Sequence, residues 1–90
     1  MTKKEPAYSV QILRLLYFTY DTIITKEVGD VLWISDAHAS NLLRYMWGKG
    51  WISRKLEYLK PHGRRFRYTI TDKGYNLIVW LESQGVIELP

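Results

Sequence analysis

The chain contains no cysteine. Disulfide bridges, thiol catalysis and cysteine-ligated zinc are therefore excluded. The only histidines are His38 and His62, too few for a metal site, which usually needs about three or four protein ligands. We therefore expect no metal and no other cofactor. The lack of cysteine is common in intracellular proteins, and we predict a cytoplasmic location.

The residue patterns of common catalytic sites are also missing. The sequence has neither a pair of carboxylates at a catalytic spacing nor a glycine-rich phosphate loop. A nucleophile–base pair would have to join a serine to His38 or His62, and both histidines are predicted on exposed surfaces. We therefore expect that the protein is not an enzyme.

Long apolar runs are absent as well. No stretch approaches the roughly 18 apolar residues of a membrane-spanning helix, so we expect no membrane association. The N-terminal MTKKEPAYSVQILRLLYF superficially resembles a signal peptide. Gln11 and Arg14 interrupt its apolar part and no small-residue cleavage site follows, so we do not interpret it as one.

What the chain does have is a large share of apolar residues. Of its 90 residues, 47% are hydrophobic and 14% aromatic, well above the content of disordered chains. A chain of this length forms one core with little stability to spare. We predict a single domain over 1–90, in which 1–6 are loose.

Positive charge is concentrated in one segment. The whole chain has a net charge of +4. Residues 53–68 hold six basic side chains against Glu57, a net +5, so the rest of the chain carries −1. A run of charge is usually only a solvated face, but this concentration favours contact with phosphate groups.

Hydrophobic periodicity, capping residues and turn residues divide the chain into elements. Thr25, Ser35 and Thr71 are the predicted helix N-caps. Gly29 lies inside a helix, where it either permits another helix to approach closely or is simply tolerated. The predicted elements are a helix over 7–20, a short strand at 23–24, a helix-turn-helix over 25–48, a two-stranded wing over 51–70 and a last helix over 72–84. This order predicts an α+β winged helix-turn-helix fold, with a three-helix core, a short strand, a two-stranded β-wing and a C-terminal helix.

The helix that begins at Ser35 has a small polar face opposite its apolar face. In a helix-turn-helix this second helix enters the major groove of DNA. Asn41 is suited to adenine, whereas Arg44 suits guanine or a phosphate. Asp36 either contacts DNA or only supports the helix N-terminus, and His38 either reads a base or is merely solvated. The predicted DNA-binding residues of this helix are Ser35, Asp36, His38, Ser40, Asn41, Arg44 and Tyr45.

The wing carries a second set of candidates. Arg64 and Arg65, beside Gly63, are the preferred ones, because arginine favours a narrow minor groove. Strand alternation places Phe66 and Tyr68 on the face opposite Arg65 and Arg67. We interpret these aromatics as core residues rather than as a stacking surface for single strands. The predicted DNA-binding residues of the wing are Arg54, Lys55, Lys60, His62, Arg64, Arg65 and Arg67.

Two stretches resemble a known family of regulators. Residues 25–54, TKEVGDVLWISDAHASNLLRYMWGKGWISR, are similar to the helix-turn-helix and first wing strand of MarR- and PadR-type winged-helix proteins. Residues 64–78, RRFRYTITDKGYNLI, are similar to their second wing strand and following helix, where Y-x-I/L-T-x-x-G is common. The resemblance covers about residues 7–84 and extends to small winged-helix proteins of archaea and their viruses. Trp33 departs from it, standing where the family's turn usually has glycine.

Apolar residues remain on the two end helices after one core is accounted for. Surplus faces of this kind usually mark an interface, and the resemblance implies a two-fold dimer through the first and last helices. We therefore predict a homodimer on a palindromic DNA site, with half-sites about 10 bp or a multiple apart. The predicted interface consists of Tyr8, Leu15, Phe18, Leu77, Trp80 and the tail 86–90.

Together these features predict a sequence-specific regulator of transcription that binds double-stranded DNA. The recognition helix would lie in the major groove and the basic wing on the adjacent minor groove and backbone. The alternative is a winged-helix module that contacts protein or RNA without reading DNA sequence.

Overall fold

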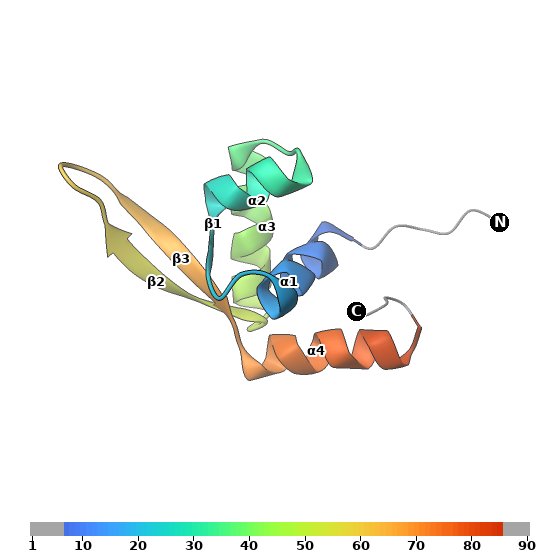
Figure 1. The fold of residues 1–90 in the computed structure, drawn as a ribbon. Coiled ribbons are helices and arrows are strands. Elements are labelled where there is room, and N and C mark those ends of the chain that lie inside the picture. The colour runs from blue at the N-terminus through green and yellow to red at the C-terminus, as the bar shows by residue number, and fades with distance from the viewer. Residues whose placement is uncertain (1–6, 86–90) are drawn as a thin grey trace.

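The helices and strands follow the predicted order (Figure 1). The structure is a computed structural model and describes residues 7–85. Its elements are α1 (Tyr8–Phe18), β1 (Ile23–Ile24), α2 (Thr25–Leu32), α3 (Asp36–Gly48), β2 (Ile52–Tyr58), β3 (Arg64–Ile70) and α4 (Asp72–Ser83). The strands form one antiparallel sheet in the order β1-β3-β2. The predicted α+β winged helix-turn-helix architecture is thus confirmed.

Two of the three predicted helix caps are confirmed. The Ser35 hydroxyl accepts a hydrogen bond from the His38 N–H at 3.1 Å, and the Thr71 hydroxyl accepts one from the Gly74 N–H at 3.1 Å. The third prediction was wrong, since Thr25 is already the first residue of α2. The Glu27 carboxylate instead accepts the N–H of Ile24 at 3.0 Å, so this acidic side chain stabilises the helix start.

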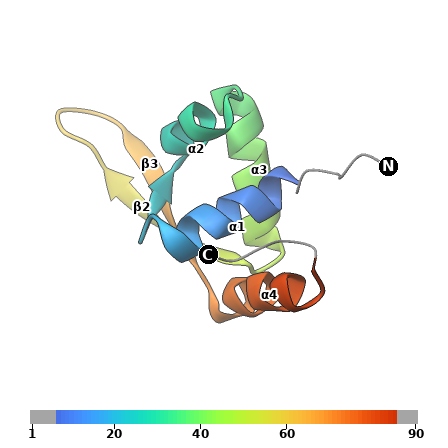
Figure 2. The same cartoon turned by 45° about the vertical axis from the view of Figure 1, so that its right-hand side comes forward.

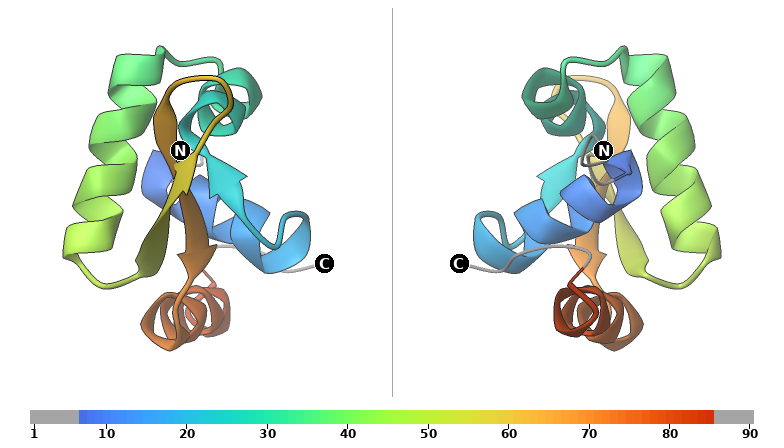
Figure 3. Two further views of the ribbon diagram at one scale, coloured as in Figure 1. Left: turned by 90° about the vertical axis from the view of Figure 1, so that its left-hand side faces the viewer. Right: turned by 90° about the vertical axis from the view of Figure 1, so that its right-hand side faces the viewer.

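The core lies where the end helices and α3 meet the base of the sheet. α1 lies between α3 and α4 (Figure 2). α3 runs along one side of the molecule, and α4 lies at the base of the hairpin (Figure 3). The buried apolar side chains are Ile12, Leu13, Leu16, Ile23, Val28, Ala39, Leu43, Met46, Ile52, Tyr68 and Ile78.

Two glycines permit close approaches that hold the helices in place. A Cβ at Gly74 would collide with the carbonyl oxygen of Trp51, the residue just before β2. The start of α4 can pack against Trp51 because glycine has no side chain. A Cβ at Gly29 would lie 3.1 Å from both Asp36 Oδ1 and the Ile34 carbonyl oxygen. Of the two readings of Gly29, the structure therefore favours close packing, here against the turn and the start of α3.

The hairpin of β2 and β3 extends away from the helices as a long arm (Figure 1). Its register pairs Arg54 with Tyr68 and Glu57 with Arg65. Alternation then divides the arm into two faces. The inner face continues the core outward and consists of Ile52, Arg54, Leu56, Tyr58, Arg64, Phe66, Tyr68 and Ile70. The outer face consists of Ser53, Lys55, Glu57, Arg65, Arg67 and Thr69.

None of the helices within residues 7–85 has the length and apolar content to cross a membrane.

Candidate nucleic-acid interface

α3 presents the small polar face that the helical period predicts. Asn41 and Arg44 are exposed and Ser40 is half-buried. They lie away from Ala39, Leu43 and the other buried residues of this helix. The amide of Asn41 and the guanidinium of Arg44 therefore offer hydrogen-bond donors and an acceptor to a surface laid against this helix.

The start of α3 is engaged in local structure. The Ser35 hydroxyl is occupied in the helix cap, and Asp36 lies in the first turn, where negative charge is favourable. The His38 ring packs edge-on against the Tyr8 ring, with centroids 5.5 Å apart. This contact ties the flank of α3 that carries His38 to α1, and it gives Tyr8 a partner within the chain.

Tyr45 sits at the edge of the same surface. It is 53% exposed, and its ring packs edge-on against Trp51 at 5.9 Å between centroids. Lys49 Nζ lies 5.5 Å from the centre of the Tyr45 ring. Tyr45 is therefore partly held by the turn that follows α3, while its hydroxyl can still serve as a donor or acceptor.

On the outer face of the hairpin, Glu57 binds two of the predicted wing arginines. Arg65 Nη2 lies 2.6 Å from Glu57 Oε1, and Arg67 Nε lies 2.7 Å from Glu57 Oε2. Arg67 Nη1 also donates to the Thr22 hydroxyl at 3.0 Å, which links the hairpin to the turn before β1. Hydrogen bonds first from Arg67 and then from Arg65 lower the pKa of Glu57 to about 2.

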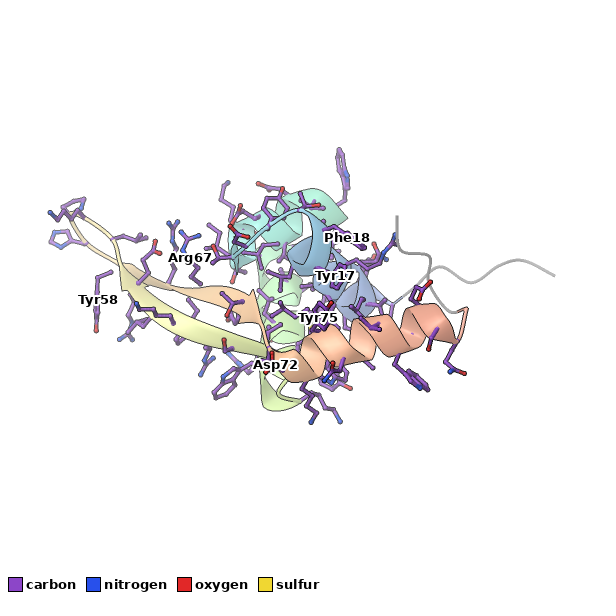
Figure 4. The ribbon with its side chains drawn as sticks, turned by 60° about the horizontal axis from the view of Figure 1, so that its bottom comes forward. Tyr17, Phe18, Tyr58, Arg67, Asp72 and Tyr75 are labelled. Carbon is purple, nitrogen blue, oxygen red and sulfur yellow. The ribbon has the colours of Figure 1, made fainter. Side chains whose placement is uncertain are left out.

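This network divides the basic residues of the wing by what they bind. Arg65 and Arg67 are engaged by Glu57. Their outer face is opposite the one that carries Tyr58, as Figure 4 shows for Arg67 and Tyr58. Within residues 7–85 the basic side chains of the wing that form no ion pair are Arg54, Lys55, Lys60 and Arg64. His62 is exposed in the turn at the tip.

The two aromatic residues of β3 have different environments. Tyr68 is buried at 3% exposure, as predicted for a core residue. The core interpretation was wrong for Phe66, which is 36% exposed. Phe66 lies further out along the arm than the helices cover, and its ring packs on the Arg54 guanidinium, whose carbon lies 4.1 Å from the ring centre.

Arg54 is contacted by a second ring on its other side. The Trp47 ring of α3 has its centre 3.6 Å from the guanidinium carbon of Arg54. Contacts of this kind contribute about 0.5–1 kcal/mol each at exposed sites. Trp47 was not among the residues predicted for the site. The available signal was strand alternation, which places Arg54 on the same face as the apolar residues Ile52 and Leu56 and not on the outer face.

The predicted interface residues on the end helices differ in their exposure. Tyr8, Phe18 and Trp80 are 40%, 41% and 56% exposed. Leu15 and Leu77 are half-buried and pack against the core. Leu15 and Phe18 also line a groove of about 370 Å³ between α1 and α2, together with Gln11, Arg14, Thr19, Val31 and Leu32. The tail 86–90 lies outside the described residues.

Comparisons with known proteins identify the fold. No protein-family model matches the sequence, and no curated protein sequence matches it. A protein of Thermoplasma acidophilum assigned as a transcriptional regulator has a similar structure, with a TM-score of 0.75 and 18% identity over 88% of this chain and 79% of that chain. A mutant of MarR from E. coli, solved with operator DNA, has a TM-score of 0.69 and 17% identity over 89% of this chain and 55% of its own.

The adhesin competence repressor of Streptococcus pyogenes is a further match, with a TM-score of 0.69 and 13% identity over 93% of this chain and 60% of its own. This chain therefore spans little more than half the length of several of the regulators it matches. Other matching structures are named as MarR-family proteins. Identities this low establish the fold alone, and the chain has the winged helix-turn-helix fold of MarR-family transcriptional regulators.

Proposed function

We propose that the protein is a regulator of transcription that binds double-stranded DNA in the cytoplasm. The observation that carries the proposal is the exposed polar face of α3 beside a hairpin with a surplus of positive charge. The solved complex of E. coli MarR with operator DNA supports it, because that protein has a similar fold. Phosphate contacts would supply most of the affinity, and base contacts the specificity.

α3 is the proposed reading element. A helix fits the major groove, where its outward side chains reach the edges of bases. Asn41 is placed to bind the N6 and N7 positions of adenine, and Arg44 to bind guanine or a phosphate. Ser40, on the flank of this face, is suited to a backbone phosphate. Tyr45 would contact the backbone through its hydroxyl.

The wing is the proposed positioning element. Lys60, His62 and Arg64 lie at or next to its tip and would contact the adjacent minor groove and backbone. The outer-face arginines, Arg65 and Arg67, retain positive charge beyond the single Glu57 that they bind. They would add to the attraction of the arm for phosphate without holding a defined contact.

A palindromic site read by two copies is part of the proposal. A two-fold pair would place two α3 helices in successive major grooves, so that half-sites lie about 10 bp or a multiple apart. Exposed apolar side chains on α1 and α4, namely Phe18 and Trp80, support such a pair.

The test is binding-site selection from a random duplex library, followed by the Asn41→Ala variant. We expect one palindrome to be enriched. Asn41→Ala should weaken binding to that duplex by about 1–3 kcal/mol and leave binding to a random duplex nearly unchanged. Asn76→Ala is the matched control, because Asn76 is an exposed asparagine on α4.

Two outcomes would overturn the proposal. If the wild-type protein enriches no duplex, the reading of DNA sequence is wrong, and binding to RNA or to an acidic protein becomes the alternative to measure. If Asn41→Ala weakens binding to selected and random duplexes equally, Asn41 does not read a base.

A further inference from the structure

Arg54 is held between two aromatic rings that come from different elements. Its guanidinium carbon lies 3.6 Å from the centre of the Trp47 ring on α3 and 4.1 Å from the centre of the Phe66 ring on β3. Rings at these distances cover the faces of a planar guanidinium. Only its edges, where the N–H donors point, are left for hydrogen bonding.

Those donors are not used within the described part of the chain. Among residues 7–85, Arg54 forms neither a hydrogen bond nor an ion pair, whereas Arg65 and Arg67 both bind Glu57. Arg54 is also only half-buried, so its edges remain accessible. A guanidinium that is held in place and has free N–H donors is suited to bind an anion, because charge-assisted hydrogen bonds are stronger than neutral ones.

The position of Arg54 indicates which kind of anion could reach its guanidinium. Trp47 follows Ser40 and Arg44 at helical spacing, so it lies on the flank of α3 next to its polar face. Arg54 lies on the inner face of the hairpin, which is the face toward α3. The guanidinium is therefore between the proposed reading helix and the arm. If α3 occupies a major groove and the arm the adjacent minor groove, the sugar-phosphate strand that separates the two grooves passes through this place.

We propose that Arg54, clamped between Trp47 and Phe66, binds a phosphodiester of that strand with the edge of its guanidinium. The inference rests on the proposed function and assigns a defined phosphate contact within it. Guanidinium groups bind phosphate through two parallel N–H bonds. The two rings act as positioning residues, because they hold a side chain that would otherwise lose much rotational freedom on binding.

The first experiment compares Arg54→Gln with wild type on a random duplex over a series of salt concentrations. Loss of one phosphate contact should flatten the slope of log K against log salt by about 0.9. Over a fourfold rise in salt, the ratio of the wild-type affinity to the variant affinity should then shrink about 3.5-fold. Lys73→Gln, at an exposed residue on α4, removes the same charge from an element outside the clamp and should leave the slope unchanged.

Two further variants separate a phosphate contact from a purely structural role. Arg54→Lys keeps the charge and should keep the slope, but it should weaken binding because an ammonium cannot bind phosphate through two parallel N–H bonds. Phe66→Leu should weaken binding several-fold in the wild-type background and have no further effect when combined with Arg54→Gln. A stack that only holds the arm in place would give equal effects of Phe66→Leu in both backgrounds.

The outcomes for this inference and for the proposed function are distinct. If the wild-type protein binds no duplex, the proposed function fails and the phosphate contact fails with it. If wild type binds duplexes with a steep salt dependence but Arg54→Gln matches Lys73→Gln in slope and affinity, only the clamp is rejected. Thermal unfolding tests whether each variant is folded. If Arg54→Gln does not fold, Arg54→Lys decides: a variant that binds as tightly as wild type rejects the phosphate contact.

Discussion

Trp33 occupies a backbone conformation that is unfavourable for any residue with a side chain. Its φ and ψ are 58° and 43°, in the left-handed region, where it ends α2. The side chain is 93% exposed, so burial does not compensate for the strain. Glycine is the usual residue at such a helix end. The turn between α2 and α3 therefore has a left-handed geometry that glycine would adopt without strain.

Replacement of this residue by glycine should stabilise the protein. Relief of the left-handed conformation, at about 1–2 kcal/mol, is partly offset by the greater flexibility of glycine in the unfolded chain. We expect Trp33→Gly to raise the free energy of unfolding by about 0.5–1 kcal/mol, measured by urea denaturation. Trp33→Ala is the control, because alanine keeps the backbone strain and removes the ring. A glycine variant no more stable than the alanine variant would contradict this account.

At the scale of elements, the hairpin is organised by one acidic residue. Glu57 lies opposite Arg65 in the register and also binds Arg67, which in turn donates to Thr22. The same pairing raises the pKa of Arg67 above its ordinary value. The arm is thereby connected to β1 on its outer face and, through Arg54 and Trp47, to α3 on its inner face.

The Glu57 network should make stability depend on acid pH. The pKa of Glu57 is lowered from 4.5 to about 2 in the folded protein, chiefly by the hydrogen bond from Arg67. The stability that ionised Glu57 contributes is therefore fully present above its unfolded-state pKa. This stability is lost as the pH falls from about 4.5 towards about 2. We expect the difference in Tm between wild type and Glu57→Gln to be constant near neutral pH and to shrink across this window.

The matched control for that experiment is Glu82→Gln, an exposed glutamate on α4. It should show no comparable change across the same pH range. A Glu57→Gln difference that stays constant down to about pH 2 would mean that the ion pairs add nothing to stability.

At the scale of the whole molecule, the exposed apolar side chains lie on several elements. Phe18 lines the groove between α1 and α2, while Trp80 projects from α4. Leu15 and Leu77, which were predicted at the same interface, are partly buried and pack against the core. The proposed dimer therefore depends mainly on Phe18, Trp80 and Tyr8, and Tyr8 also packs against His38.

Removal of this surface should separate the two copies. We expect light scattering to give twice the 10.7 kDa chain mass for wild type. Phe18→Ser combined with Trp80→Ser should give the monomer mass, because the double variant lacks the exposed rings that would pack against the second copy. Trp33→Ala removes a comparable ring from the turn and should remain dimeric. A single peak at monomer mass for wild type across micromolar concentrations would reject the dimer.

The sequence by itself determined the order of the elements, because helices and strands follow from local spacing. Ser35 and Thr71 cap helices by accepting hydrogen bonds from residues three positions ahead, and contacts this local can be predicted from the sequence. The concentration of charge in residues 53–68 and the polar face of α3 were equally visible.

Only the tertiary structure decided which of the basic residues are engaged and which are available. Arg65 and Arg67 bind Glu57 because the strand register brings residues eight and ten positions apart into contact. Arg54 is clamped because the hairpin meets α3 at Trp47 and returns Phe66 to the same place. These contacts depend on how elements distant in the sequence pack, and local spacing does not specify that.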